Sequence, residues 1–507
     1  MNTSWLRLFL LIIGITGCAL MALAWSLHRP RKWEPHQVPI AFWYWRNESA
    51  KQTDIDSALK HTGARTLFLR AGQIDYKDGK LKRIRRVTGV LPRGTDVHLV
   101  YNGTPALLDK LESVKEAELA SAISAAYLDD LKRATKDQSH IAGVQLDLDM
   151  PTRLLKRYRD VLHSLRQQLP PSTTISITGL PTWMNSPDLA AVLLETDFWI
   201  PQCYGAEIPD EFDELIPISS VEGVTDAVTR ARALGEPFYA GLSAYSYVLL
   251  YGGDGRLLTV RGDMNPATIA NDPHLKFIER KPFEPARNSG AKVTSEWRYV
   301  YQARAAGVVD DMILRAGDLI VVDAPSTESL RATARAVRES AGEHLLGICI
   351  FRLPSLEDPA TLASSSIEAA LKDVDGSSDI GIKATLASED TLLVSLENAG
   401  PATPLLNESI TIDLTVPPGQ FRIAGLRGFS WVDLLCNSGD GTLQHCSERL
   451  ANTIRLRASA LPVAEVAEIS LSAKAESPKQ LPVDLTVHLD DGRTIRKQQL
   501  LQVTFGD

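Results

Sequence analysis

The chain has 507 residues, of which 44% are hydrophobic and 23% charged, and its formal net charge is −8. This composition is typical of a folded globular protein, and one hydrophobic core rarely extends beyond about 250–300 residues, so two domains are expected. The negative charge comes without a basic block, which argues against nucleic acid as a ligand.

The N-terminal segment differs from the rest of the chain. Residues 8–27 are nearly unbroken apolar sequence, about the 20 residues that cross a bilayer. We expect residues 1–32 to be a membrane anchor or a signal peptide, and three interpretations remain open: an uncleaved anchor, cleavage after Ala22-Leu23-Ala24, or lipidation of Cys18 in the lipobox-like Ile15-Thr16-Gly17-Cys18. All three interpretations place the rest of the chain on the periplasmic or extracellular side of a bacterial envelope, where it is either secreted or held at the membrane.

Beyond this segment, short apolar runs alternate with amphipathic helical stretches. The runs are at 38–45, 65–72, 96–103, 141–149, 173–181, 197–205, 237–245 and 346–354. Each is apolar enough for burial on both faces, which predicts an α/β fold, a closed (β/α)8 TIM barrel over residues 36–375. An open doubly wound sheet would favour a Gly-rich phosphate turn after the first strand, and none follows Trp45.

An insertion at about residues 246–326 interrupts the barrel before its last strand. Its sequence predicts a hairpin over 249–251 and 257–260, a helix over 297–306 and a strand over 318–323. Because it follows the C-terminal end of a strand, we expect it to overhang the functional face as a lid or cleft wall.

The composition changes near residue 375, and strand patterns dominate afterwards. Runs at 391–397, 409–416, 453–458, 468–473 and 483–489 predict a β-sandwich domain over residues 379–507. Cys436 and Cys446 bracket a turn-rich loop and are expected to form a disulfide in an oxidising compartment, the alternative being two free thiols.

The fourth predicted barrel strand carries the clearest candidate catalytic residues. Gln145, Asp147 and Asp149 alternate with apolar residues, so they share one face of the strand. Two neighbouring carboxyls split their pKa values, and a protonated carboxyl beside an ionised one suits glycosidic bond cleavage. The alternative for Asp149 is that it caps the next helix.

Polar and aromatic side chains at other strand ends complete a predicted carbohydrate site, because aromatic rings stack on sugars while amides and guanidinium groups bond hydroxyls. The candidate substrate-binding residues are Trp43, Arg70, Asn102, Gln145, Trp183, Gln202, Tyr204, Tyr245 and Arg352. A tryptophan taken singly is more often a core residue, and Arg70 or Arg352 could instead neutralise the carboxylates in a buried ion pair. No CxxC, HExxH or histidine cluster occurs, so neither a metal nor a cofactor is predicted.

The segment Gly143-Val144-Gln145-Leu146-Asp147-Leu148-Asp149 resembles the fourth-strand motif Gly-x-Asp-x-Asp-x-Glu of family 18 (chitinase-like) glycoside hydrolases. The resemblance implies that Asp149 is the general acid and Asp147 its orienting neighbour. Gln202-Cys203-Tyr204 lies where that family has Met-x-Tyr, which implies a substrate-holding role for Tyr204. The chain departs from the motif at Asp149, one methylene shorter than glutamate, and at Gln145.

Residues 38–355 also resemble an uncharacterised bacterial barrel family known only as a domain of unknown function. The residues that carry this resemblance are the Gln-x-Asp-x-Asp strand, Thr178-Gly179-Leu180-Pro181-x-Trp183 and Pro201-Gln202-Cys203-Tyr204. The sequence thus predicts an exported glycoside hydrolase-like protein acting on a polysaccharide or oligosaccharide. An N-acetyl group on that substrate would be an internal nucleophile. The alternative is a non-catalytic glycan-binding or scaffold protein.

Overall fold

The computed structural model describes residues 33–46, 50–285, 287–288, 291–355, 358–374, 379–401, 403–407, 409–437, 442–473 and 478–505. The predicted anchor or signal segment at 1–32, including Cys18, lies outside these residues. Within the described ranges, no helix is long and apolar enough to span a bilayer.

Eight parallel strands form a closed barrel, as the alternating apolar runs predicted. Strand β1 pairs with both β2 and β16, which closes the ring. The eight strands are β1 (Ile40–Tyr44), β2 (Thr66–Lys77), β4 (Asp96–Gly103), β5 (His140–Asp147), β6 (Thr174–Gly179), β7 (Phe198–Pro201), β8 (Phe238–Ser243) and β16 (Leu345–Phe351).

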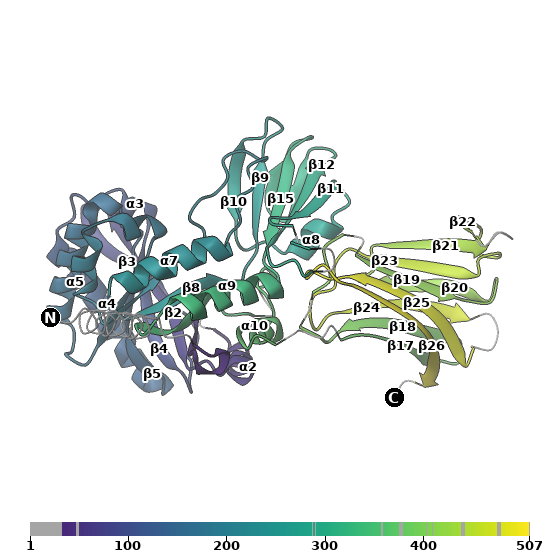
Figure 1. The fold of residues 1–507 in the computed structure, drawn as a ribbon, viewed down its shortest axis with the longest axis horizontal. Coiled ribbons are helices and arrows are strands. Elements are labelled where there is room, and N and C mark those ends of the chain that lie inside the picture. The colour runs from purple at the N-terminus through teal and green to yellow at the C-terminus, as the bar shows by residue number, and fades with distance from the viewer. Residues whose placement is uncertain are drawn as a thin grey trace, which may run out of the picture.

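Helices follow most of these strands and cover the outside of the barrel, on the left of Figure 1. They are α2 (Gln52–Thr62), α3 (Pro105–Leu108), α4 (Glu116–Asp137), α5 (Leu155–Gln168), α6 (Leu189–Leu193), α7 (Val221–Ala233), α9 (Thr327–Ser340) and α10 (Ser364–Leu371). Short 3-10 helices accompany them: η1 (Pro35–Gln37), η2 (Thr152–Leu154) and η3 (Pro181–Asn185).

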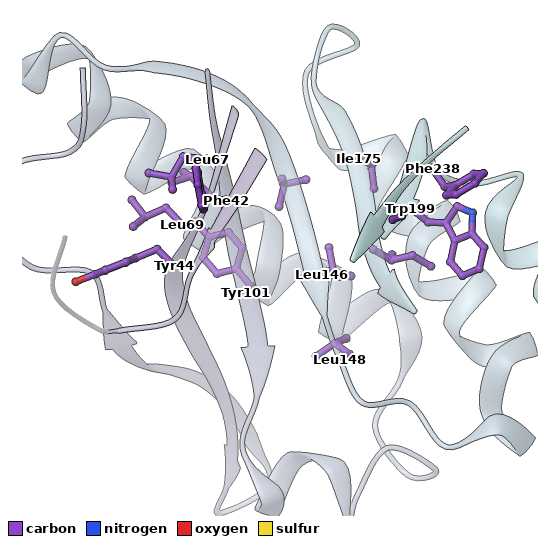
Figure 2. Close-up of a cluster of buried hydrophobic side chains, with 14 of the residues drawn as sticks. Phe42, Tyr44, Leu67, Leu69, Tyr101, Leu146, Leu148, Ile175, Trp199 and Phe238 are labelled. Carbon is purple, nitrogen blue, oxygen red and sulfur yellow. The ribbon is translucent and has the colours of Figure 1, made fainter. Parts of the chain in front are cut away.

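The barrel strands are buried on both faces, and successive side chains alternate between two cores. Phe42, Leu69 and Leu146 belong to the core between strands and helices, part of which Figure 2 shows. Ala41, Phe68 and other side chains of opposite parity belong to a separate core cluster. This alternation leaves Gln145 and Asp147 on the face opposite Leu146, as the period of a strand requires.

Strand β2 runs beyond the barrel and pairs antiparallel with β3 (Lys80–Arg86). The sequence of β3 is almost entirely cationic and gave no apolar alternation by which to predict a strand. Its arginines are held by the acidic face of α4, through the pairs Arg83–Asp130 and Arg86–Asp129. Pairing with β2 and these ion pairs therefore define a strand that local propensity does not.

The insertion forms its own antiparallel sheet, in the order β10-β9-β15-β12-β11, with a separate β13-β14 hairpin. Its elements are β9 (Tyr247–Tyr251), β10 (Leu257–Arg261), α8 (Pro266–Asn271), β11 (Leu275–Pro282), β12 (Trp297–Ala303), β13 (Gly307–Val309), β14 (Met312–Leu314) and β15 (Leu319–Ala324). The predicted hairpin and the strand at 318–323 are present, but the helix predicted over 297–306 is wrong. Residues 297–303 of that run form the interior strand β12, which pairs with β11 on one edge and β15 on the other and is buried along nearly its whole length.

The C-terminal region is made of antiparallel sheets that are separate from the barrel. Its strands are β17 (Ile380–Ser388), β18 (Thr391–Asn398), β19 (Ile410–Thr415), β20 (Phe421–Arg427), β21 (Trp431–Asn437), β22 (Leu443–His445), β23 (Thr453–Ala458), β24 (Val466–Ala473), β25 (Gln480–His488) and β26 (Thr494–Phe505). The long strand β26 pairs first with β25 and then, in parallel, with β17, and so joins two groups of strands. Side chains from both groups, such as Leu392 and Ile412, meet in one core. All five predicted strands of this region are present.

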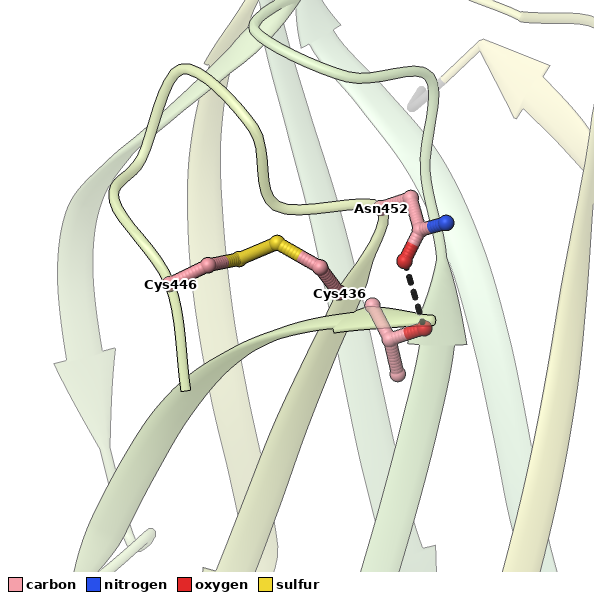
Figure 3. Close-up of a disulfide and its surroundings, with 4 residues drawn as sticks. Cys436, Cys446 and Asn452 are labelled. Atoms are coloured by element: carbon pink, nitrogen blue, oxygen red, sulfur yellow. Dashed lines mark hydrogen bonds between the residues drawn. A yellow bond between two sulfur atoms is a disulfide. The ribbon is translucent and has the colours of Figure 1, made fainter. Parts of the chain in front are cut away.

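Cys436, near the end of β21, and Cys446, just after β22, form a disulfide across the hairpin (Figure 3). Their Cα atoms are 5.9 Å apart, within the range that disulfide geometry allows. Cys203 and Cys349 are buried free thiols.

Candidate functional site

A cavity of about 450 Å³ lies at the C-terminal ends of the barrel strands, where TIM barrels place their functional residues. Eight of the predicted site residues border it: Trp43, Arg70, Asn102, Asp147, Asp149, Gln202, Tyr204 and Tyr245. The eight side chains come from six strands and the segments that follow them, so only the closed barrel brings them together. Gln145, Trp183 and Arg352 lie elsewhere.

Asp147 and Asp149 stand side by side along β5 and its continuation, and both face the cavity. Asp147 is the deeper of the two, and Asp149 is exposed. Thr178, at the end of β6, donates a hydrogen bond of 2.5 Å to Asp147 Oδ1. Asp149 caps neither η2 nor α5, whose N-caps are Pro151 and Leu154, so the helix-capping alternative for this residue is wrong.

Both carboxyls have pKa values above the ordinary range of aspartate. For Asp147, burial is the largest cause and the charge of Asp149 the second; the Thr178 hydrogen bond and the Arg70 charge oppose them, and the pKa is raised to about 6. For Asp149, desolvation raises the pKa. The pair therefore retains a proton at a pH where isolated aspartates have lost theirs, and this proton belongs to the pair as a coupled unit.

Arg70 is a cation whose charge lowers the pKa of Asp147, and it is held by neutral partners. Its Nε donates to Asn102 Oδ1 at 3.3 Å and its Nη1 to the Trp45 carbonyl at 3.1 Å. Burial, followed by the charge of Arg85, lowers the pKa of Arg70. Arg70 acts on Asp147 through space and moderates its pKa without forming a contact ion pair among the described side chains.

Arg352 does not border the cavity, contrary to its expected role in binding substrate. It forms a two-pronged ion pair with Asp358, with both N–O distances 2.5 Å, and also donates to the Gly262 carbonyl. Its guanidinium group lies over the rings of Trp45 and Tyr245, 4.7 and 5.2 Å from their centroids. Arg352 thus packs against two aromatic side chains of the cavity wall on the side away from the cavity. Its charge is neutralised by Asp358 and not by Asp147 or Asp149.

Gln145 and Trp183 are fully buried, and their contacts explain why. Gln145 Oε1 accepts a 2.7 Å hydrogen bond from Trp43 Nε1, so Gln145 fixes the orientation of a cavity residue without reaching the cavity itself. Trp183 Nε1 donates to the Met150 carbonyl at 2.8 Å, and its ring packs edge-on against Tyr158. Trp183 thus links η3 to the segment after β5. It is a core residue and does not line the cavity, as the alternative interpretation of the sequence allowed.

An aromatic cluster forms another wall of the cavity. The ring of Phe351, at the end of β16, stacks on Tyr204 with a centroid distance of 5.9 Å and an interplanar angle of 22°. Tyr245 meets Phe351 edge-on at 5.1 Å, and Trp43 lies 5.5 Å from it. Phe351 was not predicted as a site residue, although its place at the end of the last strand was the available signal.

The insertion supplies the remaining wall, with Tyr247, Val260 and Gly262 bordering the cavity. It also fixes the loop that follows β7 and carries Gln202 and Tyr204. Glu296 accepts hydrogen bonds from the backbone N–H groups of Ile218 and Ser219.

Arg298, two residues further along the chain and within β12, reinforces this attachment. It pairs with Asp323 at 2.8 Å through both Nε and Nη2, and its Nη1 donates to the carbonyls of Phe212 and Glu214. Glu296, just before β12, and Arg298 in β12 hold the loop against the inserted sheet, at a location that no motif in the sequence marks.

Thr178 and Tyr247 are further cavity residues that the sequence gave no reason to choose individually. Thr178 lies in the segment Thr178-Gly179-Leu180-Pro181, whose strand-end position was its only signal. The hydroxyl of Tyr247 is buried without a hydrogen-bond partner among the described residues. Within the described part of the chain, no group of three or more His, Cys, Asp or Glu side chains is arranged to hold a metal ion.

Residues 108–268, from the end of α3 to α8 in the insertion, match the family model described as domain of unknown function (DUF3142). No curated protein matches the sequence.

Solved structures with similar barrels include the spore cortex-lytic enzyme SleL of Bacillus cereus, at 14% identity and a TM-score of 0.42 over 66% of this chain and 73% of that one. A chitinase from Chromobacterium violaceum matches at 15% identity and a TM-score of 0.42, over 66% of this chain and 98% of that one. The chitinase-like agglutinin of Robinia pseudoacacia matches at 13% identity and 0.41, over 65% and 99%. With TM-scores below 0.5, these similarities carry no weight in assigning a function.

Proposed function

We propose that this chain is an exported glycoside hydrolase-like protein that binds a polysaccharide or oligosaccharide in the barrel cavity and cleaves it by acid catalysis. The observation that carries the proposal is the pair of carboxyls with raised pKa values, Asp147 and Asp149, in a cavity whose lining includes aromatic rings, amides and one arginine. Glycoside cleavage needs a carboxyl that still holds its proton near neutral pH.

Asp149 is the proposed proton donor, since it is the more exposed carboxyl, while Asp147 is engaged by Thr178. The proton passes from Asp149 to the glycosidic oxygen as the C1–O bond breaks. On a substrate with an N-acetyl group, the acetamido oxygen forms the new bond to C1, and water then opens that intermediate and returns a proton to Asp149. The charge of Asp149 raises the pKa of Asp147, and the two coupled carboxyls share the proton until Asp149 donates it.

Trp43 and Tyr204 are proposed to stack on sugar rings, while Asn102 and Gln202 bond hydroxyl or acetamido groups. Each of these side chains borders the cavity. A cavity of about 450 Å³ is suited to one or two sugar units, because ligand pockets of roughly 300–1,000 Å³ hold ligands of that size. Export is supported by the Cys436–Cys446 disulfide, since disulfides persist in oxidising compartments.

The test is turnover of defined glycans by the purified chain. Chitin oligosaccharides, peptidoglycan fragments and exopolysaccharide fragments are incubated with the wild type, Asp149→Asn and Asp147→Asn, and products are identified by mass spectrometry. Asp160→Asn, on the exposed face of α5, is the matched control. We expect cleavage of at least one glycan by the wild type and the control, and a loss of about 10²-fold or more in Asp149→Asn.

A second candidate is a non-catalytic glycan-binding protein. It is favoured by Asp149 itself, whose side chain is one methylene shorter than the glutamate of the motif it resembles. Equal binding by the wild type and Asp149→Asn without turnover by either would establish this candidate and reject the hydrolase. Binding of no glycan by the wild type would reject both.

A further inference from the structure

A second cavity, of about 400 Å³, lies where the barrel, the inserted sheet and the C-terminal sheets meet. We call it the junction cavity. Its wall includes side chains from α2, from the segment after β16, from β12 and from the loops of the C-terminal region, and it contains six prolines. Asp358 borders the junction cavity and accepts a hydrogen bond from the indole of Trp45, which borders the barrel cavity. One layer of side chains therefore separates the two cavities.

The wall of the junction cavity is acidic. Among the described residues that border it there are four carboxyl side chains, those of Asp54, Asp358, Glu465 and Asp490, and no lysine or arginine. The one histidine there, His61, is hydrogen bonded to Glu368. Asp358 is neutralised by its ion pair with Arg352, which leaves the other three carboxyls to act on an occupant.

Of these three carboxyls Asp490 is the most buried, with 6% of its surface exposed. Its backbone is held by Trp297, whose Nε1 donates to the Asp490 carbonyl at 2.6 Å. Oδ2 accepts a long hydrogen bond of 3.4 Å from the Thr327 backbone N–H, whereas Oδ1 has no partner among the described residues. Burial first, and then the charge of Asp491, raise the pKa of Asp490 to about 8.

A buried carboxyl oxygen without a hydrogen-bond partner is energetically costly, so such a group calls for an explanation. Two aromatic side chains, Trp297 and Tyr299, border the same cavity. Aromatic rings and carboxyl oxygens, without a lysine or arginine among the described lining residues, favour an ammonium group through cation–π contacts and charge. Because Asp490 is largely protonated without a bound cation, binding of the ammonium group is expected to release its proton.

From this combination we propose that the junction cavity binds a small ligand bearing a protonated primary amine, with Asp490 as its partner at the base and Glu465 as a second partner at the rim. A binding site for an amine is independent of the glycan-cleaving role proposed for the barrel cavity. Two sources share this chemistry, an amino sugar and the side chain of a basic amino acid, and both fit a cavity of about 400 Å³.

The test is calorimetric titration of the purified full chain with glucosamine, with lysine amide and with N-acetylglucosamine, in which the amine is blocked. The variants are Asp490→Asn and Glu465→Gln. Asp484→Asn, an exposed carboxyl on β25 of the same region, is the matched control. Unfolding midpoints are recorded for every variant, and Glu465→Gln, at an exposed position, keeps the test valid if Asp490→Asn does not fold.

We expect glucosamine, lysine amide or both to bind and N-acetylglucosamine not to bind. We also expect binding to weaken about tenfold in Asp490→Asn and about threefold in Glu465→Gln, and to stay unchanged in Asp484→Asn. The amine that binds identifies the source. Binding of neither amine, equal binding of the acetylated sugar, or unchanged affinity in both folded cavity variants would overturn the proposal, and none of these outcomes depends on whether the barrel cavity cleaves a glycan.

Discussion

At the scale of single residues, the burial that raises the pKa of Asp147 also lowers the stability of the fold once this carboxyl is ionised. A carboxyl that keeps a proton near neutral pH must be desolvated, and desolvation of its charged form costs stability. Its pKa is raised from 3.8 to about 6 in the folded chain. Between those two values the unfolded chain ionises and the folded chain does not, so the stability linked to this group falls as the pH rises through that window.

Asp147→Asn therefore removes a charge that the fold disfavours, while its amide oxygen can still accept from Thr178. We expect the free energy of unfolding to rise by about 1–2 kcal/mol at pH 8 and to be unchanged near pH 4, because one pKa unit corresponds to about 1.4 kcal/mol and the partial exposure of the site reduces the effect. Urea unfolding at the two pH values measures it. A loss of stability at pH 8 would show that the carboxylate is stabilising in the folded chain.

Thr178→Val tests the same carboxyl by removing its hydrogen-bond donor. The Thr178 hydroxyl stabilises the ionised form of Asp147, so its removal raises the pKa of Asp147 further. One hydrogen bond to a charged group contributes about 1.5–3 kcal/mol, which predicts a move of roughly one pH unit or more in the titration of Asp147. Carboxyl-carbon NMR follows the titration, with Thr225→Val on α7 as the control; a titration midpoint that stays in place or falls would contradict the assigned role of Thr178.

The candidate site itself could be predicted from the sequence only in part. The alternation around Asp147 and the strand-end positions were sufficient to choose eight residues that line the cavity. They were insufficient to distinguish a residue that borders the cavity from one that holds such a residue in place. Gln145 is as polar as the cavity residues but contacts Trp43 instead of the cavity. Arg352 likewise packs on Trp45 and Tyr245. That distinction depends on hydrogen-bond partners distant in the sequence, which one chain's pattern does not contain.

At the scale of elements, the barrel strands were predictable because burial on both faces produces continuous apolar runs with helices between them. Strand β12 was not, since the ten-residue run 297–306 mixes aromatic and apolar residues with Arg298, Gln302 and Arg304 and fits a helix as well as a strand. Its pairing with β11 and β15 decided the outcome. The inserted sheet built around β12 supplies a wall of the barrel cavity, as its position before the last barrel strand had suggested.

Tyr247 on β9 provides the sharpest test of that wall, because its hydroxyl is buried beside the cavity without a partner in the described structure. We expect Tyr247→Phe to leave the unfolding midpoint unchanged or slightly higher and to weaken glycan binding by about 3- to 10-fold, the effect of one neutral hydrogen bond. The control is Tyr251→Phe on the same strand. Its hydroxyl donates to the Pro209 carbonyl at 3.1 Å, so this change should cost about 1 kcal/mol of stability without altering affinity. Unchanged binding in Tyr247→Phe would remove the β9 wall from the site.

At the scale of the whole molecule, the barrel and the C-terminal sheets have separate cores. The C-terminal region is joined to the inserted sheet and to the barrel by hydrogen bonds and by packing of Leu405 in the core of the insertion. Trp297 Nε1 donates to Asp490, Arg280 Nη1 to the carbonyls of Leu406 and Asn407, and Ser366 Oγ to Pro401. Parts with separate cores can unfold in separate steps. The disulfide, ten residues apart in sequence, belongs to the C-terminal part alone.

Reduction of Cys436–Cys446 should therefore destabilise one part of the molecule and leave the other intact. Closing a loop of about ten residues contributes roughly 2–3 kcal/mol in the chain-entropy description. We expect Cys436→Ser with Cys446→Ser to lower the unfolding midpoint of the C-terminal sheets by several degrees, while the midpoint of the barrel and the affinity of its cavity stay the same. Differential scanning calorimetry with and without dithiothreitol separates the two steps. The fluorescence change that is lost in Trp431→Phe, at the other end of β21 from Cys436, assigns the C-terminal one. Because the free thiols Cys203 and Cys349 are already reduced and buried, dithiothreitol should have no further effect on the double variant. A single transition that moves as a whole would show instead that the contacts around Asp490 couple the two cores, so that the junction cavity lies within one cooperative unit.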